Sequence, residues 1–473
     1  MFLFVVFLIY FRYQVVSSRS QILLEKLNRE VVLLGIISDE PTDFGFRKKV
    51  VITIEKIQIG KNEIPVSSRC GINCILNPVN FFRKEFRKNK IRIVMSCDEL
   101  STHDGCALGG KIKFHGKLSL PEITEDFDSN LFLLARGIQF EMKNAKIIPW
   151  EDGGFSSYKK TSMSYEYKLK RGLFNFRNLM VENIRRVLPD KDEFALGSGI
   201  LITGKGEMSK ESLEHFKRAG LIHMVVLSGF NVSIVSQVII SFFSFLPKLL
   251  SGVFGTIGII LFCIMVGGGA TVIRSLLMSL IGIYSRIFNI GHSALMATLI
   301  AGLLMIIFNP LILIGDPSFQ LSFACTLGLV LLGNSSGWVF RFLPKSFGLR
   351  ETVSSFFATQ IFSMPLLLKF SGALSVYGIF SNLAVVPFIP LAMLLVFCAS
   401  VLCFISVDVA MLFGVVSHFV LAYFMAVVRY ISDSENALLE LGKVSDYFVI
   451  AWYIIAIPIS VFLYKKFIDY SSD

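Results

Sequence analysis

The sequence predicts a polytopic α-helical membrane protein with a small β-barrel domain ahead of its membrane helices. The first observation is composition, because 53% of the 473 residues are hydrophobic and only 17% are charged, against about 25% in a typical soluble domain. The second is distribution: residues 18–195 carry 30 Lys and Arg with 23 Asp and Glu, whereas residues 219–464 carry 9 and 7. A soluble part therefore precedes a membrane-like part, which excludes a disordered chain, a collagen and a small disulfide scaffold.

The N-terminus begins with an apolar stretch, residues 1–11, that is interrupted by Arg12. A helix needs about 20 residues to span a bilayer. A signal peptide is disfavoured because the stretch has neither a basic start nor a small-residue cleavage site. We expect residues 1–17 to form a transmembrane or partial membrane segment, or the chain to carry a late start codon.

Residues 30–150 contain segments that are rich in β-branched residues or alternate between apolar and polar positions, as strands do. The predicted strands cover residues 31–37, 50–59, 91–96, 111–120 and 138–148. Short strands with intervening turns are typical of a small barrel, so we expect an OB-like domain. Many OB-folds bind oligonucleotides, but the fold alone does not establish that function.

Four cysteines lie in this domain: Cys70, Cys74, Cys97 and Cys106. A zinc site usually needs two close pairs, and Cys70 with Cys74 has that spacing whereas Cys97 with Cys106 does not. Disulfides are possible if the domain lies outside the cytoplasm, and free thiols and a metal site are the alternatives. We expect no metal site and no cofactor.

Residues 155–219 are predicted to form an amphipathic connector. Its part from 173 to 188 is rich in Arg and Asn among apolar positions, which suits a helix lying at the membrane interface. A second helix is predicted to begin at Ser209, a good N-cap with Glu211 in the first turn, and to end at Gly220.

Residues 220–465 are predicted to form a transmembrane domain of about nine spans. The candidate spans cover residues 221–245, 252–266, 271–287, 293–308, 318–332, 353–370, 376–404, 410–428 and 447–464. Several are short, and Gly and Pro interrupt many of them. Because non-helical backbone at membrane depth is tolerated only beside protein or a watery cavity, the pattern is more typical of a channel or transporter than of an anchor.

Polar residues inside these spans are few and clustered, and they are costly in lipid unless they face protein, water or a substrate. The candidate residues of a channel or substrate path are His223, Ser228, Asn231, Arg274, Asp316, Gln320, Ser355, Thr359, Ser363 and Asn382. Ser355, Thr359 and Ser363 recur at every fourth position, a stripe that serves either close helix packing or a pore lining. Asn382 precedes a stretch that prolines interrupt. The alternative to a role in the path is that Asn382 only stabilises a kink in the helix.

Arg274 and Asp316 are the strongest individual signals. They form either a structural ion pair or contacts to an anionic substrate along a pathway. Asp316 is also a predicted N-cap, with Pro317 as the first helical residue. His223 and Ser228 suggest a hydrolytic pair, but five positions set them about 140° apart around a helix, so the two side chains would not meet directly.

Taken together, these motifs resemble those of ComEC-type competence proteins. The resemblance covers residues 30–150 and 195–430, and its motifs occur in the family's order: residues 216–232, the Arg274 helix, residues 316–323 and residues 365–387. It implies a multi-pass channel in the inner (plasma) membrane that passes single-stranded DNA into the cytoplasm during natural transformation. It also implies that the OB-like domain is extracytoplasmic.

The resemblance implies partners as well: single-stranded DNA, the lipid bilayer, and a DNA receptor, a nuclease and a cytoplasmic translocation ATPase as separate proteins. Binding of DNA phosphates requires positive groups, and a basic run in the OB-like domain is the candidate DNA-binding segment. A solvated charged loop is an equally good interpretation of this run. The residues of this run are Arg83, Lys84, Arg87, Lys88 and Lys90.

The chain also departs from the family's pattern. Asn231 stands where the family often has a second His, which argues against a catalytic or metal role there. Many members carry a C-terminal metallo-β-lactamase-like domain, but this chain has no His-x-His-x-Asp-His run. We therefore expect no enzymatic activity. The alternatives to DNA transport are a small-solute transporter or exporter and, less favoured, an intramembrane hydrolase.

Overall fold

The computed structural model describes residues 29–38, 42–44, 47–59, 62–65, 92–97, 111–121, 123–124, 127–148, 165–225, 229–291, 293–340 and 349–471. The chain divides into two compact units. The first consists of Met1–Gly172 with Ile306–Asp316, and the second of Leu173–Met305 with Pro317–Asp473. The two units are considered separately below.

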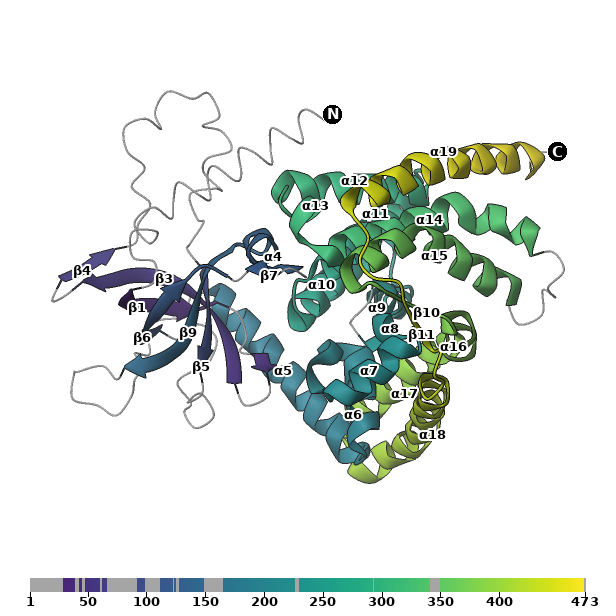
Figure 1. Cartoon of the computed structure of the whole chain (residues 1–473). Helices are drawn as coiled ribbons and strands as arrows, with labels where there is room; N and C mark the ends of the chain where they lie inside the picture. The colour runs from purple at the N-terminus through teal and green to yellow at the C-terminus, as the bar shows by residue number, and fades with distance from the viewer. Residues whose placement is uncertain are drawn as a thin grey trace. The chain divides into compact units, whose positions relative to one another are not determined.

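The first unit is built on a sheet whose long strands pair in a ring. β1 pairs with β6, β6 with β9, β9 with β5 and β5 with β3, and β3 returns to pair with β1. Only the pairing of β5 with β9 in this ring is parallel. The strands, which confirm the predicted ones, are β1 (Glu30–Ile37), β3 (Arg47–Ile59), β5 (Arg92–Cys97), β6 (Lys111–Ser119) and β9 (Ile138–Ile148), with β2 (Thr42–Phe44) and β4 (Asn62–Pro65) paired to β3 (Figure 1).

The interior of this ring is apolar because alternate residues of each strand point to the same side of the sheet. Leu33, Ile52, Phe114, Leu118 and Phe140 are each at most 1% exposed. Full burial of such side chains contributes roughly 1.5–3 kcal/mol each. The alternation seen in the sequence is therefore the pattern of a barrel core.

One glycine lets two strands of the ring approach closely. The pairing of β1 with β3 shifts register at Gly35. A Cβ atom there would lie 2.6 Å from the carbonyl oxygen of Thr53. A larger residue at position 35 would push β3 away, so we attribute the glycine to this contact.

A short helical insertion lies between β6 and β9. It packs against the segment Ile306–Asp316 of the same unit, where Asn309 donates through Nδ2 to the carbonyl of Ala135. Gly315 allows this contact, because a Cβ there would lie 2.6 Å from the carbonyl oxygen of Leu131. The elements are β7 (Ile123–Thr124), β8 (Phe127–Asp128), α4 (Ser129–Ala135) and, in the later segment, α13 (Ile312–Gly315).

The second unit begins with helices that precede the membrane spans. The helix predicted from Ser209 is confirmed: the Ser209 hydroxyl accepts a hydrogen bond from the Ser212 amide at 3.0 Å, and the chain turns at Gly220 with φ +73°. The elements are α5 (Tyr165–Val187), which starts in the first unit, α6 (Lys191–Ser198), the π-helix η4 (Gly199–Thr203), η5 (Gly204–Glu207), α7 (Lys210–Arg218) and α8 (Ile222–Val225).

Each predicted span overlaps one or more helices of the second unit or, for the span at 293–308, a helix that ends in the first. In the described part of the chain, six helices are long and apolar enough to cross a membrane, and three shorter apolar ones accompany them. The helices are α9 (Gly229–Phe242), α10 (Lys248–Val266), α11 (Ala270–Ile287), α12 (Ala294–Phe308), α14 (Pro317–Val339), α15 (Leu349–Ser371), α16 (Gly378–Val385), the 3-10 turn η7 (Val386–Phe388), α17 (Ile389–Leu402), α18 (Val407–Ser432) and α19 (Asp446–Ser471).

The first predicted span, at 221–245, contains α8 and α9, and residues 226–228 between them lie outside the described part of the chain. Met224 and Val225 of α8 are buried in the core that α6, α7, α17 and α18 share. The chain is thus a multi-pass membrane protein with an N-terminal β domain.

Candidate functional site

Arg274 of α11 lies at the centre of a buried polar site. Its Nη1 donates to the hydroxyl of Thr326 on α14 at 2.6 Å and contacts the Met278 sulfur at 3.6 Å. The ring of Phe323 lies 5.9 Å from the guanidinium carbon. No described carboxylate of the same unit lies within 4 Å of it. Asp316, the ion-pair partner considered from the sequence, ends the later segment of the other unit.

Gly229, the first residue of α9, makes room for this guanidinium. A Cβ atom at position 229 would lie 2.4 Å from Arg274 Nη2 and 2.8 Å from the Ser275 hydroxyl. Ser275 donates back to the Gly229 carbonyl at 3.2 Å. Residues from three of the motifs noted in the sequence, 216–232, the Arg274 helix and 316–323, therefore meet through Gly229, Arg274 and Phe323.

Asn231 holds the start of α9 from its other side. It is 1% exposed and donates through Nδ2 to the carbonyl of Ile200 in η4 at 3.0 Å. His223 lies on α8. Ser228 lies outside the described residues.

Asn382 supports the turn that precedes α8. Its Nδ2 donates to the carbonyl of Gly378, one turn back in α16, at 2.6 Å and reaches the carbonyl of Gly220 at 3.5 Å. Ser375 adds a bond of 2.8 Å to the carbonyl of Arg218. The side chains of Asn382 and Ser375 thus bind backbone carbonyls of the turn at residues 218–220.

The Ser and Thr stripe of α15 is occupied by helix contacts. The Thr359 hydroxyl donates to the carbonyls of Ser355 and Phe356 in its own helix, at 3.0 and 2.9 Å. Ser363 is 6% exposed. The hydrogen bonds of Thr359 lie within α15.

Asp316 and Gln320 lie at the beginning of α14. Asp316 is 3% exposed and has an extended backbone, and α14 begins at Pro317 as predicted. Gln320 is half-buried in the first turn.

Two acidic side chains of α6 bind α18, and the sequence analysis did not single them out. Glu193 is 6% exposed and lies 2.6 Å from Nδ1 of His418. Asp192 accepts bonds from Arg429 at 2.7 Å and from Ser212 at 2.9 Å. The available signal was His418, an ionisable residue within the apolar span predicted at 410–428, and such residues are usually paired.

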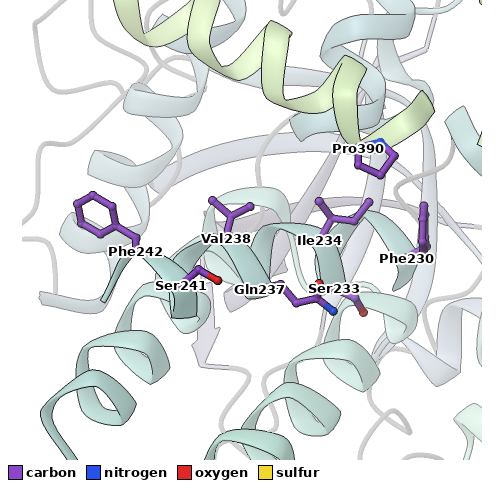
Figure 2. A pocket seen from close by; sticks show the side chains of 8 residues that line it. All are labelled: Phe230, Ser233, Ile234, Gln237, Val238, Ser241, Phe242 and Pro390. Atoms are coloured by element: carbon purple, nitrogen blue, oxygen red, sulfur yellow. The ribbon is translucent and has the colours of Figure 1, made fainter. Parts of the chain in front are cut away.

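An open pocket of about 680 Å³ lies along α9. Figure 2 shows Ser233, Gln237 and Ser241 in a row on the helix, whereas Pro390 of α17 lies on the side of Ile234 and Phe230. The apolar side chains that complete the lining are Phe230, Ile234, Val238 and Phe242. Sequence analysis missed this pocket because it assigned no role to the part of α9 beyond Asn231.

Several sequence-based predictions lie outside what the structure describes. The segment 1–17 and the basic run of Arg83, Lys84, Arg87, Lys88 and Lys90 are not among the described residues, and neither are Cys70, Cys74 and Cys106. Cys97 ends β5, but its side chain is not described. Among the described residues, no group of three or more His, Cys, Asp or Glu side chains is arranged to hold a metal ion.

Comparisons with known proteins place this site in a family. The model of the family described as "Competence protein" matches residues 200–466. An uncharacterized protein of Aquifex aeolicus (strain VF5) is 26% identical over 360 residues, which are 70% of this chain and 86% of the relative. ComE operon protein 3 of Bacillus subtilis (strain 168) is 23% identical over 287 residues, 60% of this chain and 34% of the relative.

No solved structure matches the chain. The family match spans more than half of the 473 residues, and Asn231, Arg274, Gln320 and Asn382 lie within the matched range. The chain belongs to the competence protein family.

Proposed function

We propose that this protein is the channel that carries single-stranded DNA across the cytoplasmic membrane during natural transformation. The observation that carries the proposal is the family match over residues 200–466, which covers the membrane helices that hold the Arg274 site. The match to ComE operon protein 3 covers 34% of that relative, so its whole activity is not transferred to this chain.

The physical problem is the transfer of a polyanion through hydrocarbon. One charged side chain at the bilayer centre costs at least about 2.5–3.5 kcal/mol, so a strand requires a hydrated, polar path. Arg274 supplies a positive charge that no described carboxylate of the same unit within 4 Å compensates. Such a charge lowers the electrostatic energy of phosphates that pass near it.

The β domain suits the first contact with DNA in this proposal. A five-stranded ring is the architecture of OB-folds, which bind oligonucleotides on one face and its flanking loops. We place this domain outside the cytoplasm, where DNA arrives, since long domains cross the membrane largely regardless of charge. The basic run from Arg83 to Lys90 would then contact phosphates.

We further propose that the chain acts without catalysing a reaction. Strand degradation, DNA capture and the driving force would come from a separate nuclease, a DNA receptor and a cytoplasmic translocation ATPase. These partners follow from the transport step itself, because a passive channel neither cuts nor pulls its substrate.

The test is internalisation of labelled DNA in a deletion strain. The strain should bind DNA but leave it sensitive to added nuclease, and the parent chain should restore protected label. Arg274→Ala should fail to restore it at equal membrane abundance. Arg286→Ala is the matched control, since Arg286 lies exposed in the last turn of the same helix. Normal internalisation by the deletion strain would contradict DNA transport and favour a small-solute transporter.

A further inference from the structure

The two faces of α9 have different surroundings. Val232 is fully buried and Ser236 is 2% exposed, and the Ser236 hydroxyl donates to the Val232 carbonyl of its own helix at 2.8 Å. On the other face, Phe230 is 48% and Phe242 67% exposed. The helix is therefore packed on one face and open toward the pocket on the other.

The open face carries a row of polar side chains, which a helix that faces only lipid would not be expected to carry. Ser233, Gln237 and Ser241 recur every four residues, so they form one row along the helix (Figure 2). Ser233 donates to the Gly229 carbonyl at 2.8 Å, whereas the exposed Gln237 amide has no hydrogen-bond partner among the described residues. An amide with two donors and an acceptor needs water or a polar ligand, because hydrocarbon offers neither.

Phe230 and Phe242 begin and end a second, apolar row of pocket-lining residues, with Ile234 and Val238 between them (Figure 2). The two aromatic residues are 12 positions apart, which corresponds to about 18 Å along a helix. Exposed aromatic rings are the stacking surfaces that single-stranded nucleic acids use, and stacking tolerates any base. None of the residues that line the pocket is charged, so the pocket would contact bases without holding phosphates, and a passing strand can leave it.

We propose that the open face of α9 is a hydrated wall of the DNA path, on which bases contact Phe230, Gln237 and Phe242. This inference rests on the proposed function and adds the residues that touch the strand. Arg274 lies against Gly229, the first residue of α9. It contributes positive charge at that end of the helix, while the uncharged face allows the bases to slide.

The first experiment maps water along α9 with single cysteines in the otherwise unchanged chain. Ser233→Cys, Gln237→Cys and Ser241→Cys should react with a charged, membrane-impermeant methanethiosulfonate and then lose DNA internalisation. Ser236→Cys, on the packed face, is the matched control, and the treated parent chain gives the background of the native cysteines. Added single-stranded DNA should slow the labelling of the first three variants.

Three outcomes would overturn the inference. The open-face cysteines could react only with a lipid-soluble maleimide, which identifies a lipid contact. They could react with the charged reagent while internalisation continues, which places the path elsewhere. They could react no faster than Ser236→Cys. Failure of the proposed function is distinguishable, because it shows as normal internalisation in the deletion strain, whatever the labelling pattern is.

The second experiment tests stacking. Phe230→Leu and Phe242→Leu keep an apolar side chain but remove the ring, and each should lower internalisation about fivefold if one base–ring contact is lost. Phe462→Leu is the matched control, since Phe462 of α19 is 66% exposed and Phe242 is 67% exposed, and Phe462 does not line the pocket. If Phe242→Leu and Phe462→Leu lowered internalisation equally, a stacking role for Phe242 would be contradicted.

Discussion

The guanidinium of Arg274 occupies the space that a side chain at Gly229 would need. A Cβ atom at position 229 would lie 2.4 Å from Arg274 Nη2. The glycine that begins α9 and the arginine of α11 are therefore one structural unit, although they are far apart in the sequence. Four predictions follow from this site and from the contacts that hold it.

Gly229→Ala should displace Arg274 and destabilise the protein. Overpacking in a filled interior costs about 1–3 kcal/mol. A Cβ atom at position 229 would also lie 2.8 Å from the Ser275 hydroxyl, so both side chains would have to shift, and the bond from Arg274 to Thr326 would be disturbed. Thermal unfolding in detergent measures the effect. Gly268→Ala is the control, because a Cβ there would meet only the end of Ile273 at 4.0 Å. Equal stability of the two variants would contradict the close contact.

Thr326→Val should weaken the Arg274 site without changing side-chain volume. It removes the hydroxyl that accepts from Nη1 at 2.6 Å, and an unsatisfied buried donor costs about 1–3 kcal/mol. Thr298→Val is the control, because the Thr298 hydroxyl is fully buried but bonds only its own helix. We expect the larger loss of stability at position 326; a larger loss at position 298 would show that the Arg274 contact is unimportant.

Asn231→Asp should disrupt the junction of α9 with η4. The change replaces the amide that donates to Ile200 by a carboxylate that repels the same carbonyl, at a position that is 1% exposed. Burial of an unpaired charge is strongly unfavourable, so we expect loss of folded protein in the membrane. Asn289→Asp is the control, since Asn289 lies exposed in a turn with φ 50°, a conformation that Asp also adopts. Normal abundance of Asn231→Asp would contradict the bond.

The two side-chain contacts between α6 and α18, Asp192 with Arg429 and Glu193 with His418, should differ in strength. Arg429 is 59% exposed at its side chain, and exposed pairs contribute about 0.2–1 kcal/mol. Glu193 is 8% exposed at its side chain and lies 2.6 Å from His418, and hydrogen bonds to charged groups contribute about 1.5–3 kcal/mol. Double-mutant cycles with Glu193→Gln and His418→Gln, against Asp192→Asn and Arg429→Gln, measure both coupling energies. A weaker coupling for Glu193 with His418 would contradict the role of burial.

Local patterns in the sequence predict much of the architecture. The five strands, the apolar spans and the start of α14 at Pro317 follow from alternation, hydropathy and capping residues. The helix from Ser209 to Gly220 was also predicted, because its capping bond joins residues three apart. Each of these features depends on neighbours in the chain, so a single sequence contains the information.

The candidate site depends instead on which helix faces which. Arg274 and Asp316 are the prominent charges of the membrane block, yet Arg274 binds Thr326, 52 positions away. Glu193 and His418 are 225 positions apart. Helical periodicity places side chains on a face of a helix, but it does not say which partner covers that face.

The division of the chain into a charged N-terminal part and an apolar C-terminal part could be predicted from composition, because burial in lipid limits which residues a span accepts. The division of α9 into a packed face with Ser236 and an open face with Gln237 could not be predicted from the sequence. Both are polar residues in one apolar helix, and only the packing of α10 and α11 against one side of it decides which of them is buried.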